Sequence, residues 1–173
     1  MTNIKIITKD KWVNDLIELS KRQTAYSQQY GKNTLLFDGT TWWSDCSNLQ
    51  KALFNGRDIN DYTIGKFQKD LSNTGDVNSY GLIELMDDIS TNFTLLKEGE
   101  PRILYLKGHI GAYLGKEIET DHGICNVIES TGSWGGGIRC SYVNSEGERT
   151  YGKDGEKNGT WIKHGLPLKW VQY

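Results

Sequence analysis

The chain has 173 residues, 24% of them charged, and a formal net charge of −2 at pH 7. This length can bury a hydrophobic core, and we expect one domain over residues 1–173. The balanced charge excludes the broad basic field that a nucleic-acid partner or an anionic membrane surface would need.

The cellular compartment follows from the start of the chain and from its cysteines. The first residues, MTNIKIITKDKW, contain no apolar run long enough for a signal peptide, and no later segment is long and apolar enough for a bilayer. Cys46, Cys125 and Cys140 are an odd number of cysteines without a repeated spacing, which favours free thiols in a reducing compartment. We therefore expect a protein made in the cytoplasm.

The N-terminal part predicts two helices. Asp10 can cap the first, because an apolar stripe at helical spacing follows it. A loop-rich stretch around the FDG turn signal comes next, and then Asp45 or Ser44 can cap a second helix that ends at Gly56. The expected buried faces of the two helices consist of Trp12, Val13, Leu16, Ile17 and Leu19, and of Leu49, Ala52 and Leu53.

The pattern changes from helix to strand near residue 99. Residues 57–98 predict short helices and loops, with Ile64, Phe67 and Leu71 on one face. Short β-rich runs separated by Gly, Asp, Asn and Ser follow: RILYLKG, HIGAYLG, CNVIEST, IRCSYVN and GTWIKHG. We therefore expect an α+β fold in which N-terminal helices pack on a central antiparallel sheet.

Cys46 stands where the second helix is expected to begin. Unpaired backbone N–H groups and the positive end of the helix dipole favour a thiolate there. The same N–H groups could hold the oxyanion that forms when a thiolate attacks a carbonyl. A buried, unreactive cysteine is the alternative, and position alone does not exclude it.

A nucleophilic cysteine needs an imidazole to accept and return its proton. His109 is the best candidate, because it opens the HIGAYLG strand between the small residues Gly108 and Gly111, which we expect to leave room for another chain. His122, in a turn, and His164, near the C-terminus, are expected to be solvated or structural.

A third polar group usually orients the base. The CNVIEST strand follows the HIGAYLG strand after a turn, so the two should pair as a hairpin. This pairing would bring Glu129 beside His109, with Asn126 as the second choice.

Other signals carry less information. Trp134, in the glycine-rich GSWGGGIR turn, is a candidate stacking surface for sugar or peptide, while core packing is expected for at least half of Trp42, Trp43, Trp161 and Trp170. A zinc site built from His109, His122, Cys125 and Glu129 has no paired-ligand spacing in its favour, and no cofactor is expected. The carboxylates Glu84, Asp87 and Asp88 do not make a glycosidase pair.

Several segments resemble one enzyme family. SDCSNLQKALF, GHIGAYLG and NVIESTGSW, in this order, are similar to the NlpC-like, papain-type cell-wall cysteine peptidases and the related CHAP amidases. WWSDCSNLQKALFNG, LSNTGD, GHIGAYLG and GTWIKHGLP resemble the catalytic domains of phage endolysins and prophage lysins of Gram-positive hosts. The likeness runs roughly from Gln23 to Tyr173.

The resemblance implies roles for particular residues. Cys46 would be the nucleophile, His109 the base and Glu129 the orienting residue, while Asp45 would fix the helix start. The usual glycine after Asp-Cys-Ser is Asn48 here, and Glu129 stands where His or Asn is commoner, although CHAP-type members have Glu there. The resemblance also implies a tyrosine lining the peptide groove, which is either Tyr26 or Tyr30.

The resemblance thus implies a papain-like peptidoglycan hydrolase of the endolysin type that needs no metal. The bond it cleaves is either the N-acetylmuramoyl–L-alanine amide or a peptide bond of the stem. Such an enzyme would wait in the host cytoplasm until it is released to the cell wall, as a single-domain lysin or as a catalytic domain of a longer protein. The rival hypotheses are a non-catalytic wall-binding or structural domain with a peptidase fold, and a zinc hydrolase. The oligomeric state does not follow from the sequence.

Overall fold

The computed structural model describes residues 7–30, 34–66 and 75–173, which form an α+β fold. In chain order the elements are β1 (Ile7–Thr8), α1 (Lys9–Ser20), β2 (Thr24–Tyr26), β3 (Leu36–Phe37), β4 (Trp42–Ser44), α2 (Cys46–Phe54), α3 (Ser79–Glu84), β5 (Asp87–Ser90), the 3₁₀ helix η1 (Phe93–Leu95), β6 (Arg102–Leu106), β7 (His109–Thr120), β8 (Gly123–Thr131), β9 (Gly137–Val143), β10 (Glu148–Thr150), β11 (Lys157–Thr160), β12 (Lys163–Leu166) and β13 (Val171–Gln172). None of the helices in these ranges is long and apolar enough to cross a membrane.

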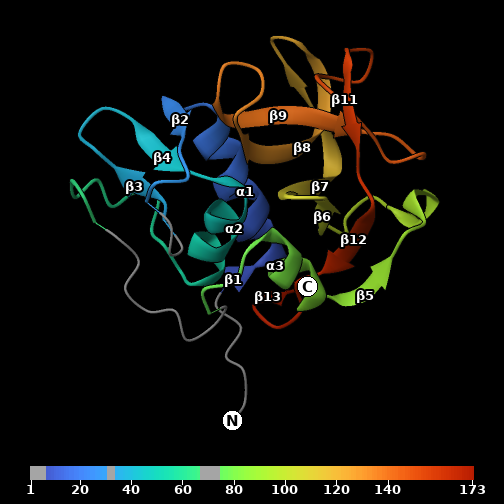
Figure 1. Ribbon diagram of the computed structural model, residues 1–173, viewed down its shortest axis with the longest axis horizontal. Helices are drawn as coiled ribbons and strands as arrows, with labels where there is room; N and C mark the ends of the chain where they lie inside the picture. Colours follow the sequence, from blue (N-terminus) through green and yellow to red (C-terminus); the bar gives the residue numbers. More distant parts are fainter. Residues whose placement is uncertain (1–6, 31–33, 67–74) are drawn as a thin grey trace.

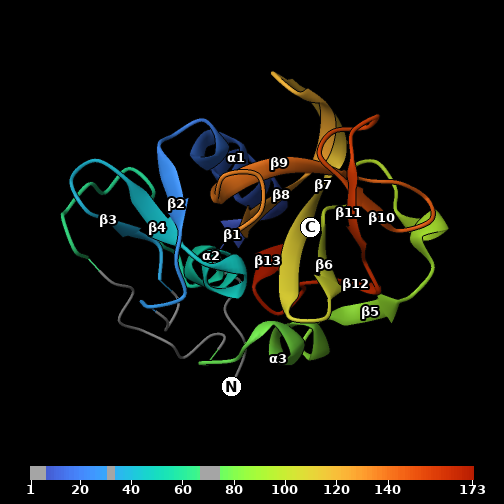
Figure 2. The same cartoon turned by 45° about the horizontal axis from the view of Figure 1, so that its top comes forward.

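The largest sheet has the strand order β11-β10-β9-β8-β7-β6-β12-β5, and every neighbouring pair in it is antiparallel. A small sheet, β2-β4-β3, lies at the other end of the long axis of the molecule, and α1 and α2 lie between the two sheets (Figures 1 and 2). The predicted α+β class and the antiparallel second half are therefore confirmed.

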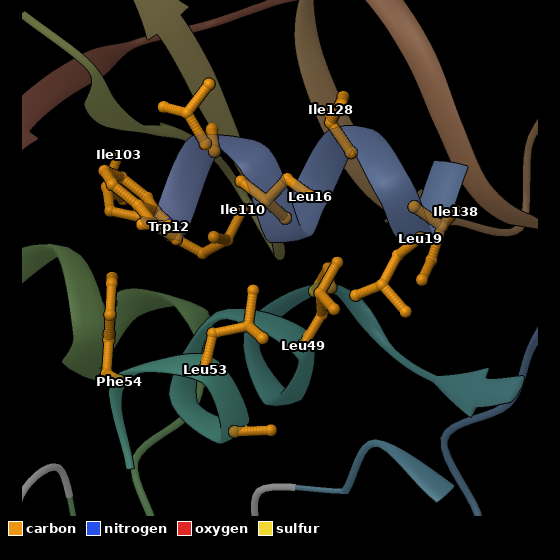
Figure 3. Packing of buried hydrophobic residues seen from close by; sticks show 14 of the residues in the cluster. Trp12, Leu16, Leu19, Leu49, Leu53, Phe54, Ile103, Ile110, Ile128 and Ile138 are labelled. Carbon is orange, nitrogen blue, oxygen red and sulfur yellow. The ribbon is translucent and has the colours of Figure 1, made fainter. Parts of the chain in front are cut away.

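The main core lies where α1 and α2 meet the large sheet. Trp12 and Leu16 of α1 face Leu49 and Leu53 of α2, and Ile128 of β8 lies beside them (Figure 3). These five side chains are buried almost completely. Burying each contributes roughly 1.5–3 kcal/mol relative to exposure. The prediction that the Cys46 helix packs on the sheet is confirmed.

The N-cap of the first helix lies two residues earlier than the sequence suggested. Thr8, not Asp10, is its N-cap: Thr8 has extended backbone angles, and its hydroxyl accepts the N–H of Lys11 at 3.1 Å. Asp10 lies inside the first turn, where a carboxylate also complements the helix dipole. Either residue type can start a helix, and here Thr8 both ends the strand β1 and caps the helix.

The FDG stretch is more ordered than a loop. Asp38 and Gly39 join β3 and β4 as a hairpin, and the Asp38 carboxylate accepts the N–H groups of Thr40 and Thr41. Gly39 has a φ of 109°, which a residue with a side chain rarely adopts. Residues 57–98 contain the expected short helices α3 and η1 and, in addition, the strand β5. Phe67 and Leu71 lie outside the described residues, as do residues 71–74 of the LSNTGD motif.

Two predicted strands differ from the observed ones. The HIGAYLG strand continues to Thr120, with an irregular register between Tyr113 and Ile118 that passes Gly115 at a φ of 72°. GTWIKHG is not one strand but parts of two: β11 pairs with β10, and β12, six places further along the sheet order, pairs with β6. Trp161 lies between them, where the chain crosses the sheet.

Candidate active site

Cys46 is the first residue of α2, and polar contacts of its neighbours fix the start of that helix. Asp45 is the N-cap: one carboxylate oxygen accepts the backbone N–H of Asn48 at 2.9 Å and the other accepts the Asn48 side-chain amide at 2.8 Å. The Asn48 side chain thus completes the cap. The backbone N–H groups of Cys46 and Ser47 have no hydrogen-bond acceptor among the described residues.

A buried hydroxyl pair ties this helix start to the sheet. The Ser44 and Ser130 hydroxyls lie 2.8 Å apart, and both side chains are fully buried. Ser44 ends β4 two residues before Cys46, and Ser130 follows Glu129 on β8. The contact therefore holds the thiol at a fixed place relative to the strand that carries Glu129.

His109 and Glu129 lie next to each other, as the hairpin prediction required. In the β7–β8 pair Ala112 lies opposite Ile128, and this register places Glu129 near the start of β7. The His109 Nε2 atom lies 2.7 Å from a Glu129 carboxylate oxygen. Nδ1 is the ring nitrogen that remains for Cys46, whose side chain lies close enough to help raise the pKa of His109.

Glu129 is held by residues that the sequence did not suggest. Its carboxylate is fully buried and accepts the Ser141 hydroxyl at 2.5 Å. The Arg149 guanidinium also donates to this carboxylate. Its Nε lies 2.9 Å from one carboxylate oxygen and 3.1 Å from the other, and a terminal nitrogen donates as well. Arg149 is itself 4% exposed and stacks on the Trp134 ring with its central carbon 4.3 Å from the ring centroid. Glu129 is therefore a buried charge with a full set of partners.

The site favours a protonated His109. Burial lowers the pKa of His109. The interactions of its ring with Cys46 and Glu129 outweigh this effect of burial and raise the pKa to about 9. Burial alone would raise the pKa of Glu129, but His109 and then Arg149 hold it below its usual range. The geometry thus stabilises an imidazolium between two acidic groups near neutral pH.

Trp161 covers the imidazole. The His109 and Trp161 rings stack with their centroids 5.6 Å apart and their planes at 19°. Gly111 makes this approach possible, because a Cβ there would lie 2.8 Å from the Trp161 ring. The expectation that Gly111 leaves room for another chain is therefore wrong, since Trp161 fills the space. Gly108 does face open space, because a Cβ there would meet no atom within 4 Å.

A cavity of about 430 Å³ opens at Cys46. Its lining includes Asp45, Cys46 and Gly108 together with Lys51 on α2. Lys51 is 2% exposed, donates to the carbonyl of Val77, and burial lowers its pKa. The cavity has room for an extended peptide segment beside the thiol.

The structure separates the candidate groove residues. Burial, and then the charge of Cys46, raise the pKa of Tyr26, which pairs with Ser44 across β2 and β4 and so lies close to the thiol. Tyr30 instead contacts the Trp43 ring edge to face at 6.0 Å. Trp134 packs on Arg149 and on Tyr151, and it does not line the cavity at Cys46. Core packing was expected for at least half of the four tryptophans Trp42, Trp43, Trp161 and Trp170. It is found for three of them, Trp42, Trp161 and Trp170.

The remaining histidines and cysteines lie in separate contacts. His164 is fully buried with Nε2 2.8 Å from the Asn92 carbonyl. His122 stacks on Tyr151 at 3.7 Å, and its Nε2 atom lies 3.5 Å from the Cys125 sulfur. The prediction of free thiols is confirmed for all three cysteines.

The alternative roles weighed for these residues are not supported by their positions. His109 and Glu129 form one pair and His122 and Cys125 another, and no cluster of three or more metal-ligating side chains occurs within the described ranges. The Asn126 side-chain amide donates to the Val143 carbonyl at 3.0 Å and accepts the Val143 backbone N–H at 2.8 Å. Asn126 therefore does not reach His109.

In comparisons with known proteins, no family model, no curated protein and no solved structure matches this chain.

Proposed function

We propose that this protein is a papain-like cysteine peptidase or amidase that cleaves an amide bond of bacterial peptidoglycan. The observation that carries the proposal is the convergence of three groups from separate elements: Cys46 at the start of α2, His109 at the start of β7 and Glu129 near the end of β8. A buried cysteine without a catalytic role would not need an imidazole that is oriented by a buried carboxylate.

The reaction steps follow from the positions of these three groups. The Cys46 thiolate attacks the carbonyl carbon, a C–S bond forms, and the N–H groups of Cys46 and Ser47 stabilise the oxyanion. His109 donates its proton to the leaving nitrogen as the C–N bond breaks, which leaves a thioester on Cys46. A water molecule then gives a proton to His109 and attacks the thioester, which releases the carboxylic acid and restores the Cys46 thiolate beside the protonated His109. Glu129 keeps the ring oriented and balances its charge.

The substrate class rests on the resemblance of the Cys46, His109 and Glu129 segments to cell-wall peptidases, and the amidase and endopeptidase alternatives remain. Purified Gram-positive walls should release soluble muropeptides when treated with the protein, and mass spectrometry of the new termini identifies the bond. EDTA should not reduce the release, whereas iodoacetamide should. Walls that release nothing under conditions where the protein is folded contradict the proposal.

The pH profile offers a test of the imidazolium. Because His109 has a pKa of about 9, above the ordinary value of about 6.5, it should stay protonated through neutral pH and lose its proton as the pH rises through about 9. Turnover of a soluble muropeptide should therefore fall along an alkaline limb near that pH. In Glu129→Gln the limb should move to lower pH, since one of the groups that raises the pKa has lost its charge. A limb that does not move would remove Glu129 from contact with the proton-carrying ring.

A further inference from the structure

A second and larger cavity lies on the face of the large sheet that carries His109. Its volume is about 780 Å³, within the range of small-molecule sites. The same face of β7 carries His109, Gly111 and Tyr113, which are two residues apart along the strand, and Tyr113 lines this cavity. Four residues along a strand place Tyr113 about 13 Å from His109. Trp161, which packs on Gly111, separates the two places.

The floor of this cavity is aromatic and apolar. Phe93, Tyr113 and Val143 belong to the buried cluster on this face, with exposed fractions of 6%, 8% and 3%. The half-buried Tyr142 ring forms a wall. Such rings offer flat apolar area beside a polar edge, and this suits a ligand that has both apolar faces and polar groups.

Polar side chains line the cavity beside this floor. Tyr113 is 8% exposed as a whole, but its hydroxyl reaches the cavity: it makes no hydrogen bond within the part of the chain that the structure describes, and it is not one of the buried polar atoms there. Burial raises the pKa of Tyr113, and so do Tyr142 and the nearby carboxylates Glu98 and Glu117. Glu117 has only a 3.3 Å bond from the Tyr142 hydroxyl and a lysine 3.9 Å away. A ligand that occupies the cavity can therefore bond to the Tyr113 hydroxyl in place of water.

The mixture of groups restricts the ligand. Glu98 and Glu117 accept hydrogen bonds, Lys116 donates them, and the Tyr113 hydroxyl can do both. An anion would be repelled by the two carboxylates, and an ammonium group, which only donates, could not use Lys116. Hydroxyl groups donate and accept, so they match all four.

We propose that this cavity binds a neutral, hydroxyl-rich saccharide, with the apolar face of a sugar ring on the half-buried Tyr142 ring. That the saccharide is the glycan strand of peptidoglycan rests on the proposed function. Binding here would hold the wall polymer about 13 Å from the catalytic histidine, and it does not require cleavage.

The test is isothermal titration of full-length Cys46→Ser protein with two probes, an N-acetylglucosamine tetrasaccharide and a glucose tetrasaccharide. We expect binding of at least one probe. Tyr113→Phe, which removes only the hydroxyl, should weaken it about fivefold, the effect of one lost hydrogen bond. Tyr142→Ala should weaken it more than about tenfold. Tyr80→Phe is the matched control, because Tyr80 is 53% exposed and lies outside this cavity.

Each outcome decides the proposal. The proposal is overturned if neither probe binds at millimolar concentration. It is also overturned if the Tyr113→Phe and Tyr142→Ala variants bind the probes as tightly as the parent Cys46→Ser protein. Preference for the N-acetylated probe assigns the site to wall glycan, and preference for the glucose probe assigns it to another glycan. In the protein with Cys46 intact, Tyr142→Ala should raise KM on intact walls. A protein that binds the saccharide but releases no muropeptide refutes the proposed function and leaves this inference standing.

Discussion

Replacing Cys46 with alanine should abolish the release of muropeptides while the protein remains folded. No other group in the site can form the thioester, so the loss should reach the background of the assay. The helix start should survive, because the Asp45–Asn48 cap and the Ser44–Ser130 contact do not use the sulfur. Alanine is also a good helix former at this position. Clearing of wall suspensions and thermal unfolding measure the two effects.

The other two cysteines provide the control for this experiment. Cys125 is fully buried beside His122 and Thr120, and it does not line the cavity at Cys46. Cys140 is 8% exposed on β9, where its carbonyl lies 2.8 Å from Nε2 of the same His122 ring, and it does not line the cavity at Cys46 either. Cys125→Ala and Cys140→Ala should therefore keep most of the activity, with some loss of stability from the smaller side chains. Substantial wall clearing by Cys46→Ala would refute the thiol mechanism.

Local patterns predicted the parts of the site that depend on local structure. A capping aspartate before an apolar stripe located the start of α2, and Gly56, with a φ of 82°, ends that helix as expected. Two neighbouring β-rich runs predicted the β7–β8 hairpin, and the period of two along a strand then placed Glu129 beside His109. Each of these steps uses either one element or two strands that follow each other directly in the chain.

The groups that surround this pair could not be predicted in the same way. Arg149 lies in β10, a strand of three residues that has no periodic signal, and it reaches Glu129 across a separation of 20 residues. Trp161 was assigned to the middle of a strand, whereas the chain leaves the sheet there and crosses to β12. Both positions depend on strand order, which one sequence does not specify.

This environment changes what is expected of Glu129. A strand-end glutamate in solvent could be replaced at little cost, but the Glu129 carboxylate is fully buried with His109, Ser141 and Arg149 as partners. Removing one partner of a buried ion pair leaves the other charge without compensation and costs about 3–5 kcal/mol. Activity and stability must therefore be measured together for every variant at this position.

Glu129→Gln should lower turnover roughly tenfold to a thousandfold, because the amide can still accept the imidazole N–H but carries no charge. Glu129→Ala should lower it further, up to about four orders of magnitude, since the ring also loses its orientation. Both variants should unfold at lower temperature than the wild type because Arg149 loses its carboxylate. Glu119→Gln is the matched control, because Glu119 is an exposed glutamate on β7 and should change neither quantity.

A second substitution separates the two effects. Adding Arg149→Met to Glu129→Gln removes the buried charge that the single variant leaves without a carboxylate, so the double variant should recover part of the lost stability. It should not recover turnover, because the carboxylate that orients His109 is still absent. If the double variant regains both stability and turnover, the loss in Glu129→Gln arose from destabilisation alone, and Glu129 is a structural residue rather than the third member of the catalytic group. If Glu129→Gln and Glu129→Ala both cleave walls at the wild-type rate, His109 needs no carboxylate, and the Trp161 ring that covers it becomes the group to test.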